Sequence, residues 1–122
     1  MMTPNLILLY VENPETSAAF YERMFDLAPA AVHPTYAAFE FENGLYLGLW
    51  STRAKNFVSA GTGHRSELAF MVDDDDQVRI LYDRWRALGV EIEQDLHEAV
   101  FGLTFVAQDP DGHRIRVCTP DD

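Results

Sequence analysis

Asn5-Leu-Ile-Leu-Leu-Tyr-Val11, near the start of the chain, has a counterpart in Ser66-Glu-Leu-Ala-Phe-Met-Val72. Each stretch has the apolar, β-branched and aromatic composition of a buried strand, and a segment of helical periodicity follows it. Val11 and Val72, which end the two stretches, are 61 residues apart. Repetition at this spacing predicts two equivalent supersecondary units that pack together.

Both halves continue with the same order of elements. The first half predicts a helix over 15–26 and strands near 30–33, 36–41 and 45–51, and the second half predicts a helix after residue 76 and strands near 90–93, 102–107 and 113–119. Asn43-Gly44 and Asp109-Pro-Asp-Gly112 are hairpin turn signals. We therefore predict an α+β fold of one domain over 1–122. It has two βαβββ modules, about 1–52 and 65–122, a linker over 53–64, and mixed curved sheets with the helices on the outer face.

Composition limits the possible partners and location. The chain has 122 residues, 48% of them hydrophobic, which suits one folded domain with a real core. A net charge of −11 argues against nucleic acid and anionic membranes, because neutralising phosphates requires an excess of Lys and Arg. The absence of a basic leader and of a long apolar run argues against secretion and membrane insertion. The single cysteine, Cys118, cannot form an internal disulfide, so we expect a cytoplasmic protein.

Asp73–Asp76 is a run of four carboxylates just before the second predicted helix. A cation site is one interpretation. Capping is the interpretation we favour, because acidic residues there accept from free N–H groups and complement the helix dipole.

Strand alternation sorts the side chains between the helix-covered face of each sheet and the opposite face. In the last strand Ile115 and Val117 belong beneath the helix, so Arg116 and Cys118 point the other way. Arg114 of the same strand joins them, and the same reasoning on the other strands assigns to the second face Leu6, Leu8, Tyr10, Tyr46, Gly48, Trp50, Glu67, Ala69 and Met71.

This second face is too apolar to be left in water, and its composition is that of a small-molecule pocket. The alternative is that these residues fill a barrel interior or a dimer interface. Gly48 favours the pocket, because a missing side chain in the floor leaves room for a flat ligand. Phe57 in the linker and Phe101 near the extra residues of the second half are expected at the rim. For these two, disorder of Phe57 and core packing of Phe101 remain open.

Two stretches carry a resemblance to a known family. Val11-Glu-Asn-Pro-Glu-Thr-Ser-Ala-Ala-Phe-Tyr21 and Asp109-Pro-Asp-Gly-His-Arg-Ile-Arg-Val117, in the doubled plan, resemble the vicinal oxygen chelate superfamily of glyoxalase I, extradiol dioxygenases and bleomycin resistance proteins. Thr3-Pro-Asn-Leu6, Val100-Phe-Gly-Leu-Thr-Phe105 and Arg116-Val-Cys118 resemble its phenazine-antibiotic resistance members most closely. The resemblance implies a homodimer, in which the first unit of one subunit faces the second unit of the other to form shared cavities for a planar aromatic ligand.

Metal-using members of this superfamily take one ligand from each of four strands. The corresponding positions here are Leu6, Gly48, Glu67 and Arg116. Only Glu67 has a suitable donor, whereas a divalent site needs at least three protein ligands. The four histidines fall in loops or at strand ends without ligand spacing: His33, His64, His97 and His113. We therefore predict no metal and no other cofactor.

Glu67 and Arg116 have three possible roles. They form an ion pair that fills the vacant metal position, or they anchor a ligand, with Arg116 holding a carboxylate or quinone oxygen and Glu67 accepting from an N–H or hydroxyl. In the third, Glu67 is the general base of a metal-independent isomerase or lyase. That role requires a raised pKa, which a neighbouring Arg116 opposes.

The predicted function is metal-free binding that sequesters a planar aromatic, phenazine-like antibiotic without turnover. The ring is expected to stack on Trp50, Tyr46 or Phe101 and to meet Arg116 and Glu67 at its edge. The alternatives are the metal-independent enzyme and a housekeeping protein that binds an ordinary metabolite. The predicted ligand-binding residues are Tyr10, Tyr46, Gly48, Trp50, Phe57, Glu67, Met71, Phe101, Arg116 and Cys118.

Overall fold

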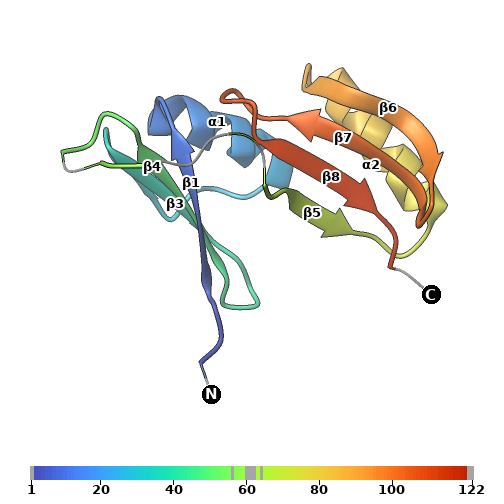
Figure 1. Ribbon diagram of the computed structural model, residues 1–122, viewed down its shortest axis with the longest axis horizontal. Helices are drawn as coiled ribbons and strands as arrows, with labels where there is room; N and C mark the ends of the chain where they lie inside the picture. The colour runs from blue at the N-terminus through green and yellow to red at the C-terminus, as the bar shows by residue number, and fades with distance from the viewer. Residues whose placement is uncertain (1, 56, 60–62, 64, 121–122) are drawn as a thin grey trace. The chain divides into compact units, whose positions relative to one another are not determined.

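The computed structural model describes residues 2–55, 57–59, 63 and 65–120, which belong to two compact units, Met1–Gly61 and Thr62–Asp122. The elements of the first unit are β1 (Leu6–Val11), α1 (Pro14–Phe25), β2 (Ala31–Val32), β3 (Tyr36–Glu40) and β4 (Tyr46–Ser51). Those of the second are β5 (Leu68–Met71), α2 (Asp75–Ala87), β6 (Glu91–Ala99), β7 (Gly102–Gln108) and β8 (Arg114–Cys118) (Figure 1). The predicted α+β fold with two βαβββ units is confirmed. The predicted linker over 53–64 lies partly outside the described residues.

The two units have the same sheet topology. The strand orders are β1-β4-β3-β2 and β5-β8-β7-β6. In the first sheet β1 is parallel to β4, whereas β3 is antiparallel to both β4 and β2. In the second, β5 is parallel to β8, and β7 is antiparallel to both β8 and β6. Both sheets are therefore mixed and open, and neither closes into a barrel.

Side chains cap both helices at their N-termini. The Asn13 side chain accepts from the backbone N–H groups of Glu15 and Thr16 at the start of α1. Asp74 accepts from the N–H of Gln77 at 2.9 Å at the start of α2. These contacts satisfy N–H groups that have no partner within a helix. The capping interpretation of the acidic run is therefore supported.

The core of the first unit lies between α1 and one face of its sheet. Tyr21 of α1 is fully buried, and its ring lies edge-on to Phe39 of β3 with 6.5 Å between the centroids. Leu47 and Leu49 of β4 are also buried. Burial of each such side chain contributes roughly 1.5–3 kcal/mol, which offsets the entropy lost in ordering it.

The core of the second unit is built around Trp85 of α2. Its ring lies edge-on to Phe70 of β5 and to Phe105 of β7, at centroid distances of 5.7 and 5.4 Å. Ile115 and Val117 of β8 are fully buried. Alternation in β8 therefore holds as predicted, and the arginines of this strand point away from the helix.

β6 differs from its prediction. The alternation of the sequence indicated a strand over 90–93, whereas the strand extends over Glu91–Ala99. Its second half, Gln94-Asp-Leu-His-Glu98, is mostly polar and exposed, so hydrogen bonding to β7 defines it rather than an apolar pattern. Two irregularities of register also interrupt the alternation. The second unit has more residues between its helix and its last strand than the first unit has, and these extra residues lie largely in the hairpin formed by β6 and β7.

None of the helices in the described part of the chain is long and apolar enough to cross a bilayer.

Candidate functional site

The face of the first sheet that points away from α1 is aromatic. β4 buries Leu47 and Leu49 on the α1 side, so its alternate residues point to the opposite side. The strand register places Tyr10 of β1 and Tyr36 of β3 on either side of Trp50. Three neighbouring strands therefore contribute rings to one row of this face.

Tyr10, Trp50 and Phe57 form what we call the aromatic cluster. Their rings meet edge to face, with centroid distances of 6.2 Å for Tyr10–Trp50, 5.0 Å for Tyr10–Phe57 and 5.1 Å for Trp50–Phe57. Tyr10 is 43% exposed, and the other two are partly exposed. Aromatic rings favour edge-on and offset contacts, so an accessible cluster of this kind suits a flat aromatic ligand.

Gly48 does not leave the open space that the sequence suggested. A Cβ atom at this position would lie 2.6 Å from Tyr36 Oη and 2.8 Å from Leu8 Cδ1. The flat group in front of Gly48 is therefore a tyrosine of the protein itself, which reaches across from β3. Gly48 does not have the positive φ that favours glycine, so close approach of this ring accounts for the missing side chain.

Tyr46 is already engaged by the protein. Its hydroxyl donates to Glu40 Oε2 at 2.9 Å, and this hydrogen bond is the main cause of the raised pKa of Tyr46. The two residues face each other across β4 and β3. Tyr46 therefore contributes its ring to this face, while its hydroxyl is already hydrogen-bonded to Glu40.

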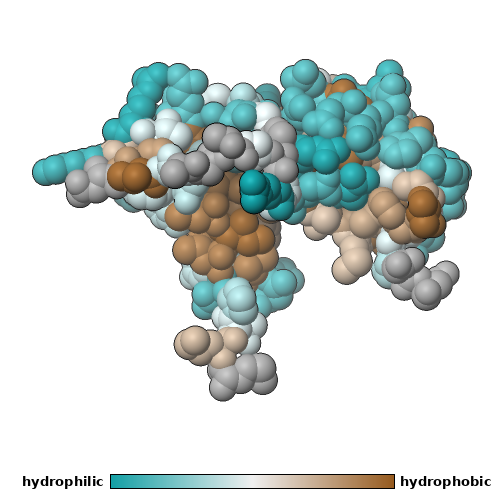
Figure 2. Space-filling view, viewed as in Figure 1, coloured by the Kyte–Doolittle hydropathy of each residue, from teal (hydrophilic) through white to brown (hydrophobic). Residues whose placement is uncertain are grey.

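The open face of the first unit carries an exposed apolar patch. Figure 2 shows a brown area over the sheet of this unit. Four of its exposed large side chains, between 38% and 48% accessible, are Leu6, Leu8, Tyr10 and Tyr46. A contiguous apolar surface of this kind marks a ligand site or an interface.

The second unit has charged side chains in the corresponding place. Arg116 donates through Nε to Glu67 Oε1 at 2.8 Å and through Nη2 to Glu67 Oε2 at 3.2 Å. Arg114 joins Glu67 Oε2 to Glu93 Oε2, at 2.8 Å in each case. We call these four residues the ion-pair network. Its two positive and two negative charges cancel, and each side chain is 28% exposed or less.

The ion-pair network argues against one of the three roles considered for Glu67, that of a general base. Hydrogen bonds from Arg116 lower the pKa of the Glu67 carboxyl, and the charges of Arg116 and Arg114 lower it further. Burial acts in the opposite direction and raises this pKa, but the net shift is downward. The same contact raises the pKa of Arg116. A general base working near neutral pH needs the opposite shift. The structure therefore favours the ion pair over the base.

Arg116 has further contacts within its unit. Its Nη1 donates to the buried Thr104 Oγ1 at 3.3 Å, and its guanidinium carbon lies 5.5 Å from the ring centroid of Phe101. Phe101 thus has a cation–π contact and is 39% exposed, and its place at a rim stays a prediction. Met71 is 70% exposed and lies in register with the partly exposed Cys118.

The positions that hold a metal in metal-using members of the superfamily do not suit one here. Leu6 and Gly48 have no donor atom, and both oxygens of Glu67 accept from guanidinium groups. Among the described residues no three His, Cys, Asp or Glu side chains are grouped to hold a metal ion. His97, expected in a loop or at a strand end, lies within β6, and His64 lies outside the described residues.

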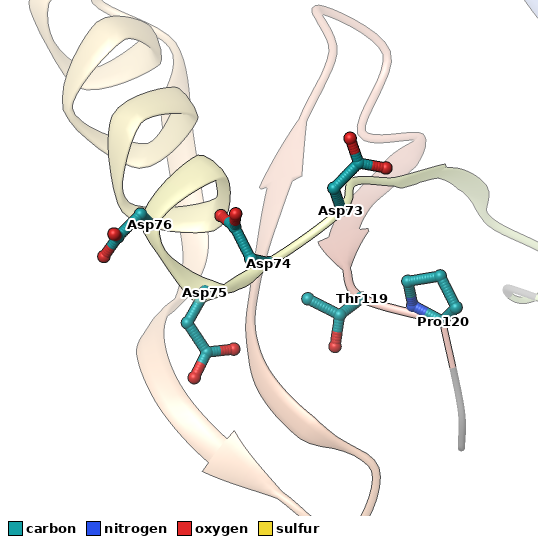
Figure 3. Close-up of a pocket in the computed structure, with 6 residues that line it drawn as sticks. All are labelled: Asp73, Asp74, Asp75, Asp76, Thr119 and Pro120. Atoms are coloured by element: carbon teal, nitrogen blue, oxygen red, sulfur yellow. The ribbon is translucent and has the colours of Figure 1, made fainter.

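A hollow of about 530 Å³ lies at the N-terminus of α2, away from the ion-pair network. Its walls are Asp73–Asp76, Thr119 and Pro120. Figure 3 shows that the four carboxylates point in different directions and not toward a common centre. The hollow therefore lacks the converging donors of a cation site.

Four residues of these faces are absent from the predicted site. Alternation in Tyr36-Ala-Ala-Phe-Glu40 places Tyr36 on the open face once Phe39 is assigned to the core. The sequence pattern could therefore have identified Tyr36 as a residue of this face. Arg114 was placed on the correct face but left out of the site. Thr104 precedes Phe105, which faces α2, so alternation in β7 could have placed it on the face of Arg116. Glu93 lies at a register irregularity between β6 and β7, where alternation gives no assignment.

A family model described as the glyoxalase/bleomycin resistance protein/dioxygenase superfamily matches residues 3–117. The chain belongs to this superfamily, which confirms the resemblance noted from the sequence. Membership defines the fold and the paired units, whereas function depends on the residues at the site.

Three relatives illustrate this membership. The chain is 35% identical to the phenazine antibiotic resistance protein EhpR of Enterobacter agglomerans, and the match covers 98% of this chain and 94% of that protein. It is 40% identical to a protein from Agrobacterium tumefaciens with a solution NMR structure, with a TM-score of 0.85 and 98% coverage of both chains. A glyoxalase-related enzyme from Fulvimarina pelagi is 25% identical, with a TM-score of 0.80 over 98% of this chain and 90% of that one.

Proposed function

We propose that this protein binds a planar aromatic antibiotic of the phenazine type and sequesters it without turnover. The observation that carries the proposal is the accessible aromatic cluster of Tyr10, Trp50 and Phe57 on a sheet face that its own helix does not cover. A flat ring on these side chains gains stacking contacts and buries apolar surface. The 35% identity to a phenazine antibiotic resistance protein supports the choice of ligand class.

The proposal involves no metal and no other cofactor. It does not use Glu67 as a base either, because Arg116 lowers the pKa of this carboxyl. The ion-pair network instead presents a polar but electrically balanced surface. We assign Glu67 and Arg116 to the open face of the second unit, where their mutual contacts fix their positions.

The proposal includes a homodimer and a cytoplasmic location. The apolar patch of the first unit is exposed, and a second copy related by two-fold symmetry would cover it and create two equivalent cavities. A single cysteine suits the reducing conditions of the cytoplasm.

Equilibrium dialysis with phenazine tests the proposed function. We expect saturable binding of one phenazine per chain, and we expect Trp50→Leu to weaken it about tenfold, because the leucine retains apolar contact but loses ring stacking. Ile80→Leu, on the exposed side of α2, is the matched control and should bind like the unaltered protein. Failure of the unaltered protein to bind phenazine at its solubility limit would contradict the proposal.

The metal-free part of the proposal is checked in the same experiment. Prior dialysis against EDTA should leave phenazine affinity unchanged, and elemental analysis should find less than one equivalent of transition metal per chain. Loss of binding after EDTA, restored by adding back one metal, would refute this part and leave the ligand class standing.

A further inference from the structure

Tyr36 occupies the centre of the open face of the first sheet. It starts from β3 opposite Trp50, and its ring leans along the sheet until the hydroxyl lies in front of Gly48. Tyr36 Cε1 and Oη lie 3.0 and 2.6 Å from the point where a Cβ of residue 48 would be. The ring therefore rests against the backbone of β4.

The hydroxyl of Tyr36 differs from those of two other tyrosines. Tyr46 donates to Glu40 and Tyr82 donates to Asp95. No described residue makes a hydrogen bond with the Tyr36 hydroxyl, although the side chain is only partly exposed and lies against apolar Leu8. A partly buried hydroxyl on an apolar face retains a strong tendency to pair with a bound polar atom.

We propose that the Tyr36 hydroxyl determines ligand specificity at this face, by donating a hydrogen bond to an acceptor atom at the edge of a planar heteroaromatic ring. This inference rests on the proposed function and names the ligand feature that is recognised: a ring nitrogen or a quinone oxygen. Apolar walls provide affinity for any flat ring of suitable size. A single polar group in a fixed position distinguishes a ring that has a hydrogen-bond acceptor from one that lacks it.

Gly48 acts here as a positioning residue for Tyr36. Its backbone conformation is available to any amino acid, so an alanine meets no conformational penalty there. The added methyl group would instead overlap Tyr36 Oη and Leu8 Cδ1 and displace the ring. Gly48→Ala should therefore remove the same specificity without removing the hydroxyl.

The test compares two ligands of the same three-ring shape, phenazine and anthracene, which differ in the two ring nitrogens. Affinities are measured by equilibrium dialysis for the unaltered protein and for Tyr36→Phe. We expect Tyr36→Phe to weaken phenazine about five- to tenfold, the effect of one hydrogen bond, and to leave anthracene within twofold. Taking the ratio of variant to unaltered protein for each ligand cancels their different hydration.

Two further variants separate recognition from structure. Tyr82→Phe removes a hydroxyl from the helix side of the second unit and should change neither affinity. Gly48→Ala should weaken phenazine more than anthracene. Equal weakening of both ligands by Tyr36→Phe, or no weakening of either, overturns the inference and leaves the proposed function intact. Failure of the unaltered protein to bind phenazine overturns both.

Discussion

Glu67 shows how two neighbouring arginines change the chemistry available to a carboxylate. Both of its oxygens accept hydrogen bonds or ion pairs from Arg116 and Arg114. A partly buried carboxylate held in this way stays ionised and has little tendency to take a proton. Its contribution to the fold therefore depends on pH in a direction that can be stated.

The pKa of Glu67 in the folded protein lies below its ordinary value of 4.5. A lowered folded-state pKa contributes stability that is present above the ordinary value and is lost as pH falls through the folded-state value. We expect Glu67→Gln to lower the free energy of unfolding by about 1–2 kcal/mol at pH 7, and by less at an acidic pH below the folded-state pKa of Glu67, where the native carboxyl is also neutral. Urea unfolding at the two pH values measures this difference.

Glu42→Gln, in an exposed turn of the first unit, is the control and should change stability little at either pH. An equal loss of stability at both pH values in Glu67→Gln would show that packing, and not charge, accounts for the effect.

The residues of the site were predictable in unequal measure. Alternation correctly assigned Trp50, Arg116 and Gly48 to the faces opposite the helices, because it depends only on the direction of Cβ. It could not show that Tyr36 leans over Gly48, because the course of a long side chain along a sheet depends on its neighbours. The interpretation of Gly48 as empty space was wrong for this reason.

At the level of elements, the caps define where α1 begins and ends. Asn13 is extended and accepts from two N–H groups, and Asp26 ends the helix in the left-handed conformation with a φ of 53°. α1 packs its buried side chains against the first sheet, so its first turn also supports the sheet that presents the aromatic cluster.

Replacing Asn13 should measure the contribution of this cap. We expect Asn13→Ala to lower the free energy of unfolding by about 1 kcal/mol, because the N–H groups of Glu15 and Thr16 lose their acceptor. Asn13→Asp keeps the acceptor and adds a favourable charge at the helix N-terminus, so it should be at least as stable as the native protein. Guanidinium unfolding gives both values; equal stability of the alanine variant and the native protein would contradict the assigned role.

Most strands were predictable from alternation and turn signals, within one or two residues. β6 was the exception, because its polar second half pairs with β7 through the backbone and carries no apolar pattern. Hydrogen bonds of the backbone do not depend on side-chain type, so a strand held mainly by them has no apolar alternation from which it could be predicted.

On the scale of the entire chain, the doubled plan was the most predictable feature. The spacing between Val11 and Val72 and the two hairpin signals identified two equivalent units, and the identical strand orders confirm them. Assembly was not predictable from spacing, since it depends on surfaces that a single chain leaves uncovered. The apolar patch and the high net charge act on assembly in opposite directions.

We expect light scattering to give a mass near twice 13.9 kDa, with a salt-dependent dissociation. Each chain carries −11, so two chains together carry −22, and raising NaCl from about 0.05 to 0.5 M should strengthen the dimer by screening this repulsion. Leu8→Glu places a charge in the apolar patch and should produce monomers, whereas Ile80→Glu, on the surface of α2, should not. A monomer at every salt concentration would refute the dimer.

The two tryptophans give this molecule a pair of internal spectroscopic probes. Trp50 is partly exposed in the first unit, whereas Trp85, on the buried side of α2 in the second, is 1% exposed. Their emission maxima should therefore differ in the native protein and converge on denaturation. A single-tryptophan protein made by Trp85→Phe or Trp50→Phe reports on one half at a time, and superimposable or separate melting curves show whether the halves lose their order cooperatively.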